Sequence, residues 1–299
     1  MPQICQFALT QPLPSPMTQS LISRDRTFSW GSRTYVMGIL NITPDSFSDG
    51  GDFATVDRAL AQAQALTAAG VDLLDIGGQS TRPGAEQISL AEELDRVLPV
   101  VSALRDQGNP LPISVDTTRA AVAAAALERG ADWINDISGG TFDPEIFDVA
   151  AQHQAPIVLM HLRGTPATMQ SLTHYDDLLG EIAQFLQTQG SIALAAGVRP
   201  DRIIFDPGIG FAKTYGQNLE IFQGLPQLRA LGYPLLVGPS RKSFIGKILD
   251  QPNPKERIWG TAAACCGAIA GGADILRVHD GEMVQVCRVA DALWGRSVA

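Results

Sequence analysis

Polar side chains recur in this 299-residue sequence at the points where predicted strands end, and seven of the eight predicted strands deliver one. The carboxyl ends of parallel strands meet at one edge of a sheet, so these groups would face a common ligand. Each residue alone is explained as well by a helix cap or a loop polar group. Their recurrence favours a binding site made by Asn41, Asp116, Asn135, His161, Asp206, Lys242, and Arg277 with His279.

Four of these side chains alternate between acceptor and donor capacity. Asp116 and Asp206 accept hydrogen bonds, Asn135 can do both, and Lys242 donates. Carboxylates would satisfy the ring N–H and amino groups of a ligand, and the lysine would satisfy a ring carbonyl or nitrogen. The set therefore predicts a flat heterocycle with amide and amine edges.

A second group of residues indicates phosphate and a metal. Arg277 and His279 are two residues apart, so they share one side of the last predicted strand, in the usual phosphate corner of a (β/α)₈ barrel. Asn41, Asp45 and Asp49 offer oxygen ligands of the kind that Mg²⁺ takes, with phosphate oxygens completing its shell. Asp45 and Asp49 are explained equally well as turn residues.

No Ser–His–Asp or Cys–His arrangement stands out in the sequence. His161 could act as a base, but a buried, hydrogen-bonded histidine is the better interpretation. The chemistry indicated is positioning of substrates and stabilisation of a leaving group, without a protein nucleophile.

The elements that must position these residues alternate regularly. Apolar runs of strand length occur at 35–40, 71–76, 112–115, 132–134, 156–160, 202–205, 234–237 and 275–279. Helical patterns follow at 55–69, 90–107, 118–129, 144–152, 175–196, 218–231, 258–270 and 281–294. Eight β-then-α units predict an α/β fold, a (β/α)₈ barrel over residues 34–299. A doubly wound open sheet is the alternative, but its GxGxxG and GxxxxGK[ST] fingerprints are absent.

Composition limits the classes of partner. The net charge is −9 with no basic tract, which argues against nucleic acid and anionic membranes. Apolar stretches are too short for a membrane span, and no signal-peptide pattern precedes Arg24, so a cytoplasmic protein is expected. Residues 1–33 are predicted to be a Pro-rich, partly disordered leader whose short strand and turn at 28–30 plug the barrel. The four cysteines fit neither a disulfide framework nor a metal site.

Several long motifs resemble dihydropteroate synthase. They are MGILNITPDSFSDGG (37–51), DIGGQSTRPGA (75–85), SVDT (114–117), INDISGG (134–140), MHLRGTPATMQ (160–170), FDPGIGFAKT (205–214), GPSRKSFIG (238–246) and RVHDG (277–281). The resemblance implies a (β/α)₈ barrel that condenses (7,8-dihydropterin-6-yl)methyl diphosphate with 4-aminobenzoate. The products would be 7,8-dihydropteroate and pyrophosphate, in a folate-biosynthesis step that sulfonamides block. Gln79 stands where many relatives carry Glu, and Ile209 where Phe is common.

The resemblance also assigns roles. Asn41 would bind magnesium, with Asp45 a further candidate; Asp116, Asn135, Asp206 and Lys242 would hold the pterin; Arg277 and His279 would hold the diphosphate. Arg82 lies in the second loop, and the aminobenzoate pocket would comprise Phe47, Thr81, Pro83, Phe211, Lys242 and Ser243. Pyrophosphate would leave first, and Asp116, Asp206 and Asp49 would stabilise the resulting cation before the aniline nitrogen attacks.

Two other functions compete with this interpretation. Methyltetrahydrofolate-dependent corrinoid methyltransferases share the pterin-binding barrel, but their chemistry has no diphosphate to hold. A degenerate barrel retained as a non-catalytic partner subunit is the third possibility, although every motif position is intact. The resemblance further implies a homodimer, for which the helix at 258–270 is a candidate face; packing of that helix on the barrel explains its composition equally well.

Overall fold

Eight parallel strands form the centre of the protein in a computed structural model that describes residues 20–42 and 52–296, with only the main chain described for 52–55. The strands are β3 (Tyr35–Asn41), β4 (Leu73–Gly77), β5 (Ile113–Asp116), β6 (Trp133–Asp136), β7 (Ile157–Met160), β8 (Ile203–Asp206), β9 (Leu236–Val237) and β10 (Ile275–Val278). Their order is β8-β7-β6-β5-β4-β3-β10-β9, and a parallel bridge from Phe205 to Leu235 closes the ring. The predicted (β/α)₈ barrel is confirmed, and the open-sheet alternative is wrong.

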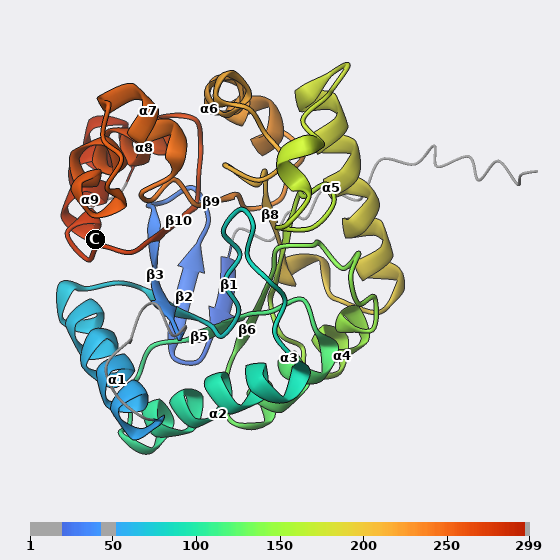
Figure 1. The fold of residues 1–299 in the computed structure, drawn as a ribbon, viewed down its shortest axis with the longest axis vertical. Coiled ribbons are helices and arrows are strands. Elements are labelled where there is room, and N and C mark those ends of the chain that lie inside the picture. The colour runs from blue at the N-terminus through green and yellow to red at the C-terminus, as the bar shows by residue number, and fades with distance from the viewer. Residues whose placement is uncertain (1–19, 43–51, 297–299) are drawn as a thin grey trace, which may run out of the picture.

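Helices follow the strands and surround them (Figure 1). They are α1 (Asp52–Ala69), α2 (Leu90–Asp106), α3 (Ala120–Glu128), α4 (Ile146–Gln152), α5 (Leu178–Ala195), α6 (Tyr215–Arg229), α7 (Ser243–Leu249), α8 (Ile258–Ala270) and α9 (Met283–Leu293). The described residues also contain 3₁₀ turns at Met169–Ser171, Pro200–Arg202 and Pro254–Glu256. Each predicted helix occurs, and α7, a short helix that begins at Ser243, is an addition to that set.

Helix ends depend on local capping groups. Gly70 ends α1 with φ +90°, its N–H donates to the Thr67 carbonyl, and the N–H of Val71 donates to the Leu66 carbonyl at 3.3 Å. α6 begins three residues earlier than predicted, because Thr214 and Gln217 form a reciprocal capping box. Caps of this kind set the register at which the helices pack on the strands.

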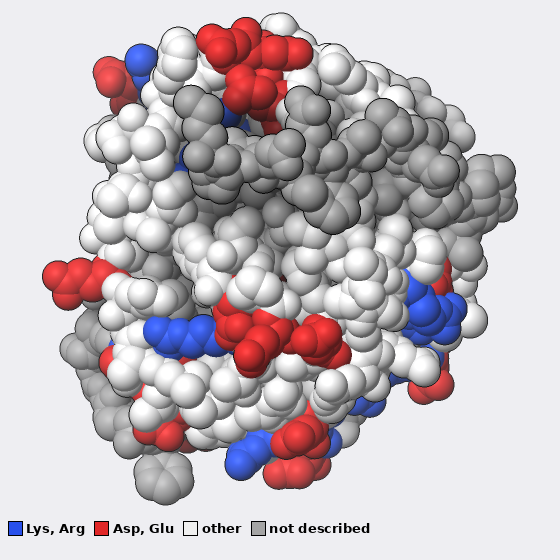
Figure 2. Space-filling view, turned by 90° about the vertical axis from the view of Figure 1, so that its right-hand side faces the viewer, with Lys and Arg blue, Asp and Glu red and all other residues white. Residues whose placement is uncertain are grey.

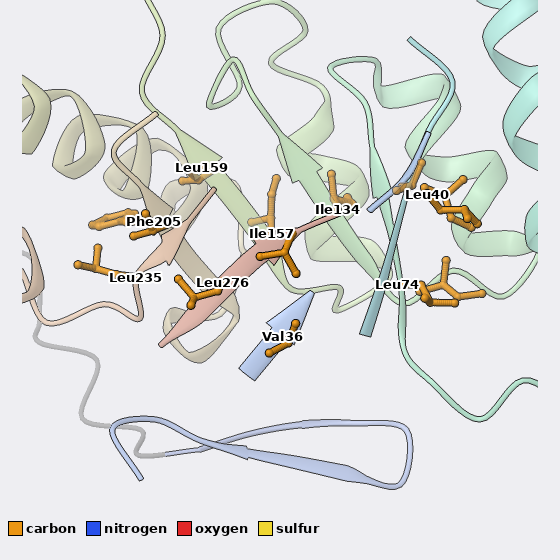
Figure 3. Close-up of a cluster of buried hydrophobic side chains, with 14 of the residues drawn as sticks. Val36, Leu40, Leu74, Ile134, Ile157, Leu159, Phe205, Leu235 and Leu276 are labelled. Atoms are coloured by element: carbon orange, nitrogen blue, oxygen red, sulfur yellow. The ribbon is translucent and has the colours of Figure 1, made fainter. Parts of the chain in front are cut away.

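The largest apolar cluster lies between strands and helices (Figure 3). Strand residues that face outward, among them Leu40, Leu74 and Phe205, are fully or almost fully buried there. Burial on both faces explains why the strands are near-continuous apolar runs in the sequence. Rigid strands of this kind fix the positions of the polar residues at their ends.

A hairpin covers the end of the barrel opposite the site. β1 (Ser20–Ser23) and β2 (Arg26–Ser29) pair antiparallel, and Figure 3 shows this hairpin below the barrel strands. Phe28 contacts Tyr35 and Trp133, at ring-centroid distances of 4.8 and 5.1 Å. A hairpin therefore stands where one short strand and a turn were predicted to plug the barrel. Residues 1–19, most of the predicted leader, lie outside the described residues.

Two further sequence expectations concern cysteines and membranes. Cys265, Cys266 and Cys287 are free thiols, and Cys265 and Cys287 are buried among apolar residues. Over 20–42 and 52–296, no helix has the length and apolarity needed to span a bilayer.

On the face shown in Figure 2, basic side chains are interspersed with acidic ones.

Candidate active site

A network of four polar side chains occupies the carboxyl end of the barrel. The guanidinium of Arg277 donates from Nε to Asp75 Oδ2 at 2.6 Å and from Nη2 to Asp116 Oδ2 at 2.7 Å. Asn135 Nδ2 donates to the same Asp75 oxygen at 3.1 Å. Within the described residues, Nη1 of Arg277 makes no hydrogen bond. Arg277 is thus fixed by two carboxylates and keeps one donor group for a ligand.

Asp75 is the functional residue that the sequence analysis passed over. It interrupts an apolar strand, its side chain is fully buried, and it lies beside Ser114 of the neighbouring strand. A buried carboxylate is costly unless it is paired, and Arg277 supplies that pairing. The charged residue inside an otherwise apolar run was the signal that could have identified it.

Two carboxyl groups of the site have raised pKa values. Burial raises the pKa of Asp116 to about 7, the nearby Arg277 opposes this, and the negative charge of Asp75 adds to it. Burial likewise raises the pKa of Asp206 to about 6, opposed by the hydrogen bond from the Gly208 N–H (2.7 Å) and by the charge of Lys242. Both groups therefore change protonation near neutral pH, where they can exchange protons with a heterocycle.

Asp136 is also buried, and burial raises its pKa to about 6. Its oxygens, however, accept hydrogen bonds from the Ser138 N–H and hydroxyl and from the Gly140 N–H, at 2.6–2.7 Å. Asp136 therefore holds a turn together.

Lys242 and Phe211 meet at the mouth of the barrel. The ammonium of Lys242 lies 4.1 Å from the centroid of the Phe211 ring, and burial together with the charge of Arg277 lowers the lysine pKa to about 8. Ser243, the first residue of α7, is exposed beside them. An ammonium over an aromatic ring is an arrangement that can bind an aromatic carboxylate through its charge and its ring.

His279 is held by the hydroxyl of Ser240. The Ser240 hydroxyl accepts a hydrogen bond from the main-chain N–H of His279 at 3.2 Å. The same oxygen lies 3.0 Å from Nδ1 of the His279 ring. Burial and the charges of Arg241 and Arg277 lower the pKa of His279 to about 3, so its ring is neutral. When the hydroxyl donates to Nδ1, the proton of the ring resides on Nε2, where it is available to an anion.

The second loop is braced by Gln79. Its side-chain oxygen accepts from the Ile88 N–H at 2.8 Å, and its amide donates to the carbonyls of Ser80 and Glu86. The Gly84 N–H donates to the Pro166 carbonyl at 3.0 Å, which ties this loop to the one after β7. Thr81 is half-buried, whereas Arg82 and Pro83 are exposed above the barrel. A glutamine in this position therefore serves to shape the loop.

His161 does not belong to the ring of ligand-facing groups. It is 2% exposed, its Nδ1 lies 2.9 Å from the ammonium of Lys213, and its ring packs edge-on against Phe185. Burial and the charge of Lys213 lower the pKa of His161 to about 2. The interpretation of His161 as a buried, hydrogen-bonded histidine is confirmed. Lys213, its partner, is a second residue that the sequence analysis missed.

Comparison with known proteins identifies this arrangement. The family model "Pterin binding enzyme" matches residues 37–279. Dihydropteroate synthase from Synechocystis is 61% identical over 98% of this chain and 100% of its own length. The chain belongs to the dihydropteroate synthase family. The Yersinia pestis dihydropteroate synthase, solved in complex with a sulfonamide drug, is 43% identical with TM-score 0.86 over 92% of this chain and 99% of its own. The Xanthomonas albilineans dihydropteroate synthase, solved with 4-aminobenzoic acid, is 42% identical with TM-score 0.85 over 92% and 98%.

Membership of this family makes the chain a transferase, and the structure brings several of the predicted residues together. Asp116, Asn135 and Arg277 share one hydrogen-bond network, and Asp206 and Lys242 lie close enough to it to influence its charges. Arg82 acts on His279 only through its charge. Asp45, Phe47 and Asp49 lie outside the described residues.

The described part of the chain offers little that could hold magnesium by itself. No group of three or more His, Cys, Asp or Glu side chains suited to a metal occurs within it. Asn41, at the carboxyl end of β3, contributes one amide oxygen beside β4. One hard oxygen ligand fits Mg²⁺ when the remaining positions are filled by water and substrate phosphates. The described residues therefore fit a metal that arrives with a diphosphate.

Proposed function

We propose that this chain joins (7,8-dihydropterin-6-yl)methyl diphosphate to 4-aminobenzoate, releasing pyrophosphate and forming 7,8-dihydropteroate for folate biosynthesis. The observation that carries the proposal is the pair of bonds from Arg277 to Asp75 and Asp116, next to the acceptors expected to hold a pterin. The 4-aminobenzoic acid in the Xanthomonas relative and the sulfonamide in the Yersinia relative support the second substrate.

The pterin would be recognised by complementary hydrogen bonds. One oxygen of Asp206 accepts from the Gly208 N–H, which leaves the other oxygen for the amide and amino edge of the ring. Asn135 and Asp116 would bind the opposite edge, and Lys242 would donate to a ring nitrogen or carbonyl. Burial raises the pKa of Asp116, which favours its protonated form and so would let it donate as well as accept.

The diphosphate would lie at β10. Nη1 of Arg277 and Nε2 of His279 donate to its oxygens, and both side chains are held from behind by other residues. Asn41, with Asp45 as a further candidate, would hold Mg²⁺, which would supply positive charge next to the leaving group. The exposed Arg82 would add charge from the second loop.

The C–O bond to the diphosphate breaks and its electrons leave with pyrophosphate, so positive charge develops on the pterin methyl carbon. Carboxylates at Asp116 and Asp206, with Asp49 from the first loop, would stabilise that charge. The amine of 4-aminobenzoate, held between Phe211 and Lys242, then forms the new C–N bond and loses a proton to pyrophosphate or water. Phe47, Thr81, Pro83 and Ser243 would complete the pocket, the loops would exclude water, and sulfonamides would compete there.

Release of pyrophosphate tests this function. Purified protein is given the pterin diphosphate, 4-aminobenzoate and Mg²⁺, and each is omitted in turn. Release that needs all three supports the synthase reaction, and Asn41→Ala should then raise the Mg²⁺ concentration needed for half-maximal rate. Tight pterin binding without release would refute the synthase reaction and favour the methyltransferase-like or degenerate barrel.

We further propose a homodimer formed through α7, α8 and α9. These helices lie together on one side of the barrel (Figure 1) and carry the exposed apolar residues Ile248, Leu249, Trp259, Leu293 and Trp294. Trp259, at the start of the helix predicted as the dimer face, is 81% exposed. Exposed apolar clusters of this kind commonly mark interfaces.

A cytoplasmic location stays a prediction from the sequence.

Sedimentation of a charged variant tests this interface. Trp259→Glu should shift the protein to monomers, because burying an unpaired carboxylate opposes association. Leu172→Glu, an exposed leucine after β7, is the matched control and should leave the oligomeric state unchanged. A Trp259→Glu protein that sediments as wild type would exclude this face.

A further inference from the structure

Lys213 is a buried cation that contacts no carboxylate of residues 20–42 or 56–296. It is 3% exposed, and within the described residues it takes part in no ion pair. Its ammonium donates to the Phe211 carbonyl at 2.8 Å and to His161 Nδ1 at 2.9 Å, and the His161 carbonyl lies 3.5 Å away. Burying an ammonium against neutral acceptors alone is costly. A charge kept at such a cost beside a ligand site suggests a role there.

The contacts of Lys213 join the ends of two neighbouring strands. The His161 N–H, directly after β7, donates to the carbonyl of Asp206 at the end of β8. Between them Gly208 approaches so closely, at φ +72°, that a Cβ there would lie 2.1 Å from the His161 carbonyl oxygen. The ammonium of Lys213 also binds the main-chain carbonyl of Phe211, in the loop after β8. The ring of Phe211 in turn contacts Lys242.

Lys213 also faces the charges of the site. Asp206 attracts it, while Lys242 and Arg163 repel it, and His161 beside it is neutral. Burial lowers the pKa of Lys213 to about 7, and the positive charge of Lys213 is one of the effects that opposes the raised pKa of Asp206. The ammonium therefore lies behind the carboxylate that would bind the pterin.

We infer that Lys213 is a positioning residue with two tasks. It holds the Phe211 wall of the aminobenzoate pocket through the main-chain carbonyl, and it keeps Asp206 ionised for pterin binding. The inference rests on the proposed function, but its pterin part is measurable without turnover.

The test compares Lys213→Met, which keeps the length of the side chain and removes its charge, with Lys213→Arg, which keeps the charge. The fluorescence of bound 6-hydroxymethylpterin gives affinity against pH, and steady-state rates give KM for 4-aminobenzoate. Lys213→Met should move the acid limb of pterin binding upward by about one pH unit. It should also raise that KM about tenfold, the effect of losing one charge-assisted hydrogen bond. Lys213→Arg should leave the acid limb in place.

Lys255→Met, an exposed lysine far along the chain, is the control and should match wild type in both readouts. A folded Lys213→Met protein with the wild-type acid limb and wild-type KM would overturn the inference. If that variant does not fold, ¹⁵N NMR of wild-type protein decides instead. The inference needs His161 Nδ1 unprotonated and accepting near neutral pH, and a protonated Nδ1 would refute it. Absence of pyrophosphate release would refute the synthase reaction and leave the pterin-binding test intact.

Discussion

Replacing Asp75 by asparagine tests whether Arg277 depends on its second carboxylate. Asn has nearly the same shape, so Asp75→Asn removes a charge without opening a cavity. The wild-type side chain is fully buried and receives 2.6 Å and 3.1 Å hydrogen bonds from Arg277 and Asn135. The variant therefore isolates the electrostatic part of the network.

The expected magnitude follows from these contacts. Leaving a buried charge without its partner costs about 3–5 kcal/mol. Arg277 retains Asp116 at 2.7 Å and its side chain is 20% exposed, so we expect the smaller cost of one charge-assisted hydrogen bond, about 2–3 kcal/mol of unfolding free energy. Because the same guanidinium would hold the diphosphate, kcat/KM for the pterin substrate should fall by roughly 30-fold or more.

The pH dependence should shift in a defined direction. The negative charge of Asp75 raises the pKa of Asp116, which is about 7 in the intact site, and Arg277 lowers it. The Asp75→Asn variant lacks the negative charge that raises the pKa of Asp116. Arg277 then forms its ion pair with Asp116 alone, so the pKa of Asp116 should fall. The acid limb of kcat/KM, which reports groups of the free enzyme, should move to lower pH even as the rate falls.

The assay is pyrophosphate release against pH, with urea unfolding in parallel. Asp72→Asn is the matched control, because Asp72 is 5% exposed, lies directly before the start of β4, and is held by Arg33 at 2.6 and 3.1 Å. The control should lose stability but keep the wild-type acid limb. If the Asp75→Asn enzyme has the wild-type kcat/KM and the wild-type acid limb of its pH profile, Arg277 does not depend on Asp75.

Two further predictions concern stability. The pKa of His161 is depressed to about 2 in the folded state, so the stability it confers is present above its unfolded pKa of about 6.5 and is lost as pH falls. The difference in unfolding free energy between wild type and His161→Asn, measured with urea, should therefore shrink by about 1 kcal/mol when the pH falls from 7.5 to 5.5. A difference that stays constant with pH would contradict the depressed pKa. Gly208→Ala should cost about 2–4 kcal/mol because its Cβ would meet the His161 carbonyl, whereas Gly216→Ala, with open space around it, should be neutral or stabilising. Equal thermal midpoints for the two alanine variants would exclude the close approach at Gly208.

The architecture was predictable because its signal is local. Each strand is a short apolar run that must be covered on both faces, and each run stops where a polar residue enters the barrel mouth. Asp116, Asn135 and Asp206 are visible in the sequence for that reason. The boundaries of the elements were less predictable, since they depend on side-chain contacts such as the capping box that starts α6 early.

The residues that were missed act through contacts that only the closed barrel creates. Asp75 lies 202 residues from Arg277 in sequence, and its role depends on the register that places β4 and β10 on either side of β3. In the sequence Lys213 resembles a surface lysine before a helix, and Ser240 a turn residue. Burial and partner identity, which a single sequence does not encode locally, distinguish all three from ordinary positions.

The charges of the site bear on the proposed role of magnesium. Three carboxylates, Asp75, Asp116 and Asp206, are set against three cationic side chains, Lys213, Lys242 and Arg277. The site is therefore close to neutral before the substrate arrives, and two of its carboxyl groups already have pKa values raised to about 6 and 7. An added diphosphate would raise those pKa values further and protonate the groups that should stabilise a pterin-methyl cation. The proposed divalent cation, arriving with the substrate, would remove that conflict, because its charge would offset the phosphates and leave the carboxylates ionised.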